Sequence, residues 1–104
     1  MPYTGEEEHE ISLEDASALT GRYRAQMSGT QIKGGYFGKN AILDVVGQEG
    51  CVGIRYYYGL DPDDKHVLVI VGVDSDGNDL TEGMILEFSM PCPDYCSATN
   101  DLNT

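Results

Sequence analysis

Basic side chains are scarce in this sequence. Six lysines and arginines stand against 18 aspartates and glutamates, which gives the 104-residue chain a formal charge of −12 at pH 7. Proteins that bind DNA, RNA or an anionic lipid surface need clustered cations to neutralise phosphates. The composition therefore argues against a nucleic acid or a membrane as the partner.

Long apolar runs are also missing. The longest run, residues 67–73, has the length of a strand and falls short of the roughly 18 residues that a membrane-spanning helix needs. The first residues, Met-Pro-Tyr-Thr-Gly-Glu-Glu-Glu, are acidic where a secretory signal would be basic and then apolar. These features predict a cytoplasmic protein.

The familiar catalytic and nucleotide-binding spacings are absent as well. The chain has two histidines, and it contains neither Gly-x-Ser-x-Gly nor His-Glu-x-x-His nor the phosphate-loop spacing Gly-x4-Gly-Lys-Ser/Thr. Acidic residues are plentiful, but their spacing marks no catalytic pair. The sequence favours a binding function over catalysis, and we expect no cofactor.

Cysteine is rare, and two of the three cysteines frame the turn PCPDYC. A zinc site would need Cys92, Cys96, Cys51 and His66 to meet in the fold, because structural zinc takes four ligands. A thiol redox pair would need Cys92 and Cys96 alone. Because the cytosol keeps thiols reduced, we interpret the segment as a rigid turn whose sulfur atoms pack against Tyr95. A thiol redox or metal-binding protein centred on this turn is the alternative function.

The length of the chain is that of one domain with a single core. Residues 1–10 read as an acidic flexible tail, residues 11–96 as one α+β domain, and residues 97–104 as a flexible C-terminal tail. The domain carries patterns of two periods. Apolar residues recur at helical spacing first, and β-branched and aromatic runs follow from Cys51 onward.

Five elements follow from these patterns. Ser12 begins a capping-box-like start, and apolar residues at steps of three and four then predict an amphipathic helix. A loop with four glycines separates it from a second helix, and three strands follow. The predicted helices cover residues 12–27 and 38–47, and the predicted strands cover residues 51–60, 66–74 and 84–90.

Polar turns connect the three strands as consecutive antiparallel neighbours. The second turn, DSDGND, lacks the glycine and glutamate positions of a calcium loop and reads as an ordinary turn. Pro91 and Pro93 should end the third strand, because proline cannot donate to a ladder. The predicted fold class is α+β, with two N-terminal helices packed on one face of a small antiparallel three-stranded meander sheet.

The middle strand is apolar on both faces, which is usual for a strand that is covered on both sides. Two helices can cover one side of a small sheet, and the other side needs loop segments or a second protein chain. We therefore expect a binding or regulatory module that uses the outer sheet face. Its partner there would be a second copy, in a dimer, or another protein. The expected interface residues are Arg55, Tyr57, Val67, Val69 and Val71.

One stretch of the chain is basic. Residues 16–43 contain four of the six cations and none of the acids. Within this stretch the segment KGGYFGK could place backbone N–H groups and two lysines around a small anion at a helix start. Anion binding by Lys33, Gly34, Gly35 and Lys39 is thus a second alternative function.

Three segments taken together carry a family resemblance. The segments GGYFGKNAILDVVGQEGCVGIRYYYGLD, VLVIVGVDSDGNDL and PCPDYC resemble those of a family of small acidic bacterial proteins. The resemblance covers roughly residues 11–97 and implies a bacterial cytoplasmic origin. It brings no activity, cofactor, partner or functional residue.

Overall fold

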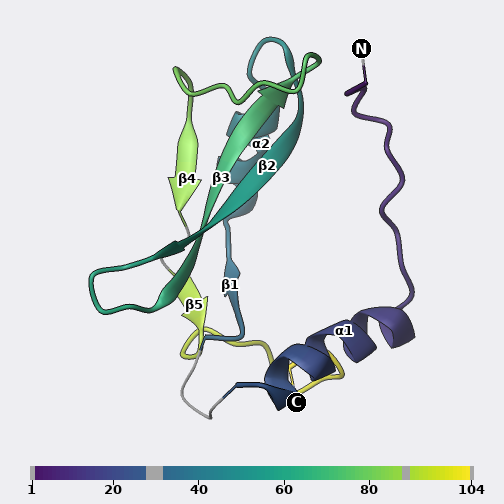
Figure 1. Cartoon of the computed structure of the whole chain (residues 1–104), viewed down its shortest axis with the longest axis vertical. Helices are drawn as coiled ribbons and strands as arrows, with labels where there is room; N and C mark the ends of the chain where they lie inside the picture. Colours follow the sequence, from purple (N-terminus) through teal and green to yellow (C-terminus); the bar gives the residue numbers. More distant parts are fainter. Residues whose placement is uncertain (1, 28–31, 88–89, 104) are drawn as a thin grey trace.

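The fold is seen in a computed structural model that describes residues 2–27, 32–87 and 90–103. Two helices precede most of the strands, and the strands form a three-stranded antiparallel sheet and a two-stranded one, so the predicted α+β class is confirmed (Figure 1). Neither helix among the described residues has the length and apolar character needed to cross a membrane.

The three-stranded sheet is the meander that the sequence predicts. Strand β2 (Cys51–Leu60) pairs with β3 (His66–Asp74), and β3 pairs in turn with the short β4 (Ile85–Glu87). The polar turn after β2 is closed by a hydrogen bond from the Asp61 N–H to the Lys65 carbonyl. The order β2-β3-β4 leaves β2 at one edge of the sheet.

The two helices differ in what they bury. Helix α1 (Leu13–Ala25) begins as predicted, with the Ser12 hydroxyl accepting from the Asp15 N–H, but none of its residues, all of which the structure describes, is buried. Helix α2 (Lys39–Val46) contacts β2 and β3 and lies behind them in Figure 1. The apolar stripe of α1 is therefore largely exposed, and α2 alone supplies the fully buried helical side chain, Val45.

A second, two-stranded sheet was not predicted. Strand β1 (Gly34–Tyr36) lies in the segment read as a loop, and it pairs with β5 (Met90–Cys92). Pro91 lies inside β5 rather than ending a strand. Such a short ribbon tolerates the proline because an edge position does not need its missing N–H.

The core is small for the length of the chain. Among the described residues the buried hydrophobic side chains are those of Ile32, Val45, Ile70, Val71 and Val73. The radius of gyration is 15.3 Å, whereas a compact domain of this length has about 13 Å. Much apolar surface on the strands and on α1 thus stays in contact with solvent in a single chain.

Candidate functional site

The candidate site is built on β2, the edge strand that carries the tyrosine run. Antiparallel pairing places Arg55 opposite Val71 and Tyr57 opposite Val69, so these four side chains share one face of the sheet. The alternate residues of β2 belong to the other face. The two faces differ in their contacts: side chains on the first face form hydrogen bonds within the chain, whereas those on the second are largely exposed.

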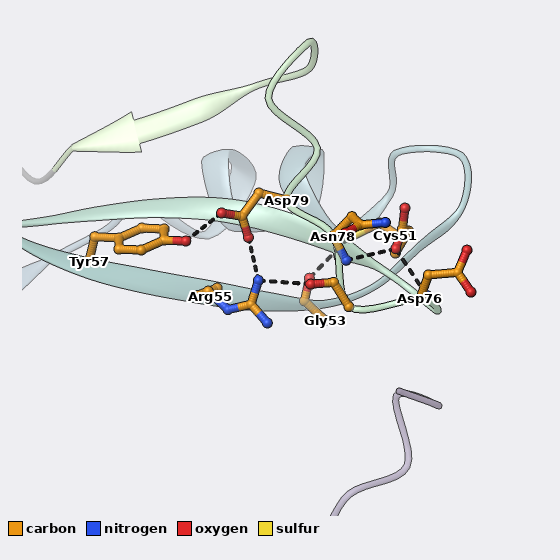
Figure 2. Close-up of polar contacts among 9 residues, drawn as sticks. Cys51, Gly53, Arg55, Tyr57, Asp76, Asn78 and Asp79 are labelled. Carbon is orange, nitrogen blue, oxygen red and sulfur yellow. Dashed lines mark hydrogen bonds and ion pairs between the residues drawn. The ribbon is translucent and has the colours of Figure 1, made fainter. Parts of the chain in front are cut away.

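On the first face, Asp79 joins Arg55 and Tyr57 (Figure 2). The Asp79 carboxylate accepts from the Arg55 guanidinium at 2.5 Å and from the Tyr57 hydroxyl at 2.5 Å, and the Gly77 carbonyl accepts a further bond from Arg55 at 3.0 Å. The backbone of Asp79 pairs with that of Val73 on the edge of β3 that faces away from β2. The side chains of Arg55 and Tyr57 therefore reach across β3.

We call the hydrogen-bonded group of Arg55, Tyr57 and Asp79 the polar bridge; it explains the burial of Val71. The bridge crosses β3 on the face that Val71 shares, and Val71 is only 3% exposed. Val71 therefore belongs to the core rather than to a docking surface, which corrects its assignment to the expected interface. Val67 and Val69 are half-buried on the same face.

The three members of the bridge shift one another's pKa values. The hydrogen bond from Tyr57, followed by the contact with Arg55, lowers the pKa of Asp79. The hydrogen bond to Asp79 raises the pKa of Tyr57 and that of Arg55. The Asp79 contribution to stability is thus present above its ordinary pKa and lost as the pH falls through the lowered value. The Tyr57 contribution is present below its ordinary pKa and lost as the pH rises through the raised value.

We expect Asp79→Asn to bring the pKa of Tyr57 down toward its ordinary value, because a neutral amide is a weaker acceptor for the Tyr57 hydroxyl than the carboxylate and because the negative charge that opposes phenolate formation is removed. NMR of proteins with isotope-labelled tyrosine rings measures this titration residue by residue. Asp76→Asn is the matched control, since Asp76 lies in the same turn, is exposed and takes no part in the bridge. An unchanged Tyr57 titration in Asp79→Asn would contradict the bridge.

On the second face, a row of four alternate apolar side chains is exposed. We call it the β2 row; its exposed fractions run from 45% at Ile54 to 82% at Tyr58, and its members are Ile54, Tyr56, Tyr58 and Leu60. Tyr56 and Tyr58 meet edge to face, with ring centroids 5.5 Å apart. Among the described residues no strand pairs with the outer edge of β2. An apolar row and an unpaired strand edge thus coincide.

The residues proposed for metal binding do not come together. Cys51 lies at the start of β2 opposite Asp74, and His66 lies opposite Leu60 at the other end of the strand. Within the described ranges no three histidine, cysteine, aspartate or glutamate side chains are grouped as metal ligands would be. The part of the chain that the structure describes thus does not bring the four proposed zinc ligands together.

Cys92 and Cys96 are joined by a disulfide, with their Cα atoms 4.7 Å apart. The two sulfur atoms are thus bonded to each other, as the redox alternative allows, and do not merely pack against Tyr95. Cys51 is the free cysteine. The Cys92 carbonyl also accepts from the Lys33 N–H, which joins the disulfide turn to the start of β1.

The proposed anion loop is drawn into the two-stranded sheet. Gly34 and Gly35 pair with Cys92 and Pro91, and the Lys33 ammonium donates to the Asn103 carbonyl at 2.9 Å. Lys39 is the first residue of α2. The two lysines thus serve different elements instead of framing one anion.

Two features of the candidate site were not predicted from the sequence. Asp79 stands in a turn segment, and only the tertiary pairing of that segment with β3 brings it to Arg55. The exposure of the β2 row follows from how little of the sheet the helices cover. Comparison with known proteins found no matching family model, curated protein or solved structure.

Proposed function

We propose that the protein is a binding module that self-associates by pairing the β2 strands of two copies. The observation that carries the proposal is the β2 row, exposed on an edge strand of ten residues. Unpaired N–H and C=O groups along such an edge are a template for another strand. Antiparallel pairing about a two-fold axis would merge two three-stranded sheets into one and bring the two rows together.

Charge supports a second copy as the partner. A chain of net charge −12 repels its own copies over most of its surface. Residues 51–60 contain no acid, and their single charge, Arg55, is paired with Asp79. Tyrosine and arginine are also the residues that interface centres favour. The second half of the β2 edge, residues 56–60, is therefore where two copies could meet with least like-charge repulsion, because Glu7 of the N-terminal segment lies beside Val52 and Arg55 at the start of the strand.

Replacing Tyr56 by lysine tests the proposal. Pairing would place an unpaired lysine charge of each copy at the joined edge, which opposes pairing, so we expect Tyr56→Lys to be a monomer at concentrations where the wild type is a dimer. Light scattering after size exclusion measures the mass. Tyr95→Lys is the control, because Tyr95 has a similar exposed fraction, 58% against 53%, and lies outside β2. A monomeric wild type, or equal loss of dimer in both variants, would overturn the proposal.

The finer assignments rest on the sequence. We propose a homodimer in the bacterial cytoplasm, on the basis of the family resemblance. In that compartment the disulfide favours a second candidate function, thiol–disulfide exchange. Glutathione would reduce Cys92 and Cys96 while two glutathione molecules became oxidised to their disulfide.

Thiol counting distinguishes the second candidate. Purified protein in denaturant should show one reactive thiol without reductant, that of Cys51, and three after reduction. For a redox pair, the count should also move between one and three as the ratio of reduced to oxidised glutathione is varied. A count of three in air-equilibrated buffer would contradict the disulfide. A count that stays at one at every glutathione ratio would show a structural disulfide and contradict the exchange function.

A further inference from the structure

A groove lies between α1 and the end of the β2–β3 hairpin that carries the connecting turn. Most of its lining is apolar. Its volume is about 620 Å³, which is in the range of small-molecule sites. Leu19 and Tyr23 of α1 contribute to its lining, as do Val67 and Leu68 of β3. Buried Ile32 also lines it, and the Ile32 carbonyl accepts a hydrogen bond from the Tyr23 hydroxyl at 3.3 Å.

The charges at this groove have one sign. Its lining contains no aspartate or glutamate, although the chain has 18 of them, and it contains two of the six cations, Arg24 and Lys33. Both cations donate to backbone carbonyls near the C-terminus, Arg24 to Leu102 and Lys33 to Asn103. Within the described ranges neither is paired with a carboxylate side chain.

We propose that this groove binds a small amphiphilic anion, an unbranched alkyl chain that ends in a carboxylate. The apolar lining would take the chain, and Lys33 and Arg24 would hold the carboxylate through charge-assisted hydrogen bonds. The acidic remainder of the surface repels anions, so the groove is where a negative head group gains most. This inference goes beyond self-association and does not require it, but the two sites share Tyr58 and Leu60 of the β2 row, so a dimer formed through β2 would compete with the anion.

Three probes of equal chain length test the chemistry. Dodecanoate, dodecanol and dodecyltrimethylammonium are titrated into the full-length protein below their aggregation concentrations, with calorimetry for affinity and circular dichroism for the fold. We expect saturable binding of dodecanoate with the fold retained, about tenfold weaker binding of dodecanol, and none of the ammonium. Equal affinity for dodecanoate and dodecanol, absence of dodecanoate binding, or loss of the fold on binding would overturn the proposal.

A pair of lysine variants locates the head group. Lys33→Gln should weaken dodecanoate binding about tenfold and leave dodecanol unaffected. Lys39→Gln makes the same charge change outside the groove and should leave both affinities unchanged. Equal losses in the two variants would mean a general charge effect and would contradict the assignment.

The same titration separates this inference from self-association. At concentrations where the wild type is a monomer, dodecanoate should bind Tyr56→Lys as tightly as it binds the wild type, because Tyr56 does not line the groove. Failure of self-association would then leave the groove assignment standing. Dodecanoate binding to Tyr56→Lys that weakens as the protein concentration rises would identify a second copy as the occupant of the groove and overturn the proposal.

Discussion

Replacing Val45 by aspartate is expected to unfold the chain. Val45 is 0% exposed and is the fully buried side chain that α2 contributes to the core. An unpaired carboxylate at such a position costs several kcal/mol, a large part of the roughly 5–15 kcal/mol that stabilises an ordinary domain. With few other buried side chains to compensate, the folded state should not survive.

Circular dichroism and urea denaturation measure this effect. Leu43→Asp is the matched control, because Leu43 lies on the same helix, is 53% exposed and would carry the same charge. The milder Val45→Ala keeps the protein folded enough to measure and should cost about 2 kcal/mol. Similar stability of Val45→Asp and Leu43→Asp would show that α2 does not pack on the sheet as described.

Replacing Gly72 by valine should be the next most damaging change. Gly72 is buried in β3, and a Cβ there would lie 2.9 Å from the Gln48 amide nitrogen, 3.0 Å from the Cys51 sulfur and 3.2 Å from a Leu80 methyl carbon. Gln48 cannot easily give way, since its side chain donates to the Val45 carbonyl and accepts from the Met84 N–H, both at 2.8 Å. Overpacking of this kind costs about 1–3 kcal/mol.

Gly53→Val is the control for this change. Gly53 lies on the neighbouring strand, and a Cβ there meets nothing within 4 Å among the described residues. Because valine suits a strand better than glycine does, Gly53→Val should be neutral or stabilising. Equal urea midpoints for the two variants would contradict the close approach of Gln48 and Leu80 to β3.

The elements that local chemistry determines could be predicted from the sequence. The Ser12 cap, the second helix, the two long strands and the polar turn between them all follow from periodicity and turn residues. Strands β1 and β5 could not be predicted, because GGY and MPC are too short and too poor in strand-forming residues to show a period. Each of these strands is held by the other, and the two lie far apart in the sequence.

The site could be predicted only in part. The tyrosine strand and its place in a hairpin follow from the sequence, but which face is exposed depends on tertiary contacts. Arg55 and Tyr57 on one face donate hydrogen bonds to Asp79 within the same chain, so we place the candidate interface on the opposite face of the strand. Similarly, α1 has the spacing of a helix with one buried face, yet its stripe is left largely exposed and lines a groove instead.

Amide hydrogen exchange followed over a dilution series tests the self-association of β2 most directly. Pairing of two copies would place new hydrogen bonds on the outer edge of this strand. We predict that those amides of residues 54–60 that point away from β3 become more protected as the protein concentration rises, while the amides of residues 13–25 keep the same rates. Exchange in residues 54–60 that is independent of concentration, while light scattering reports a dimer, would place the contact elsewhere and contradict the account.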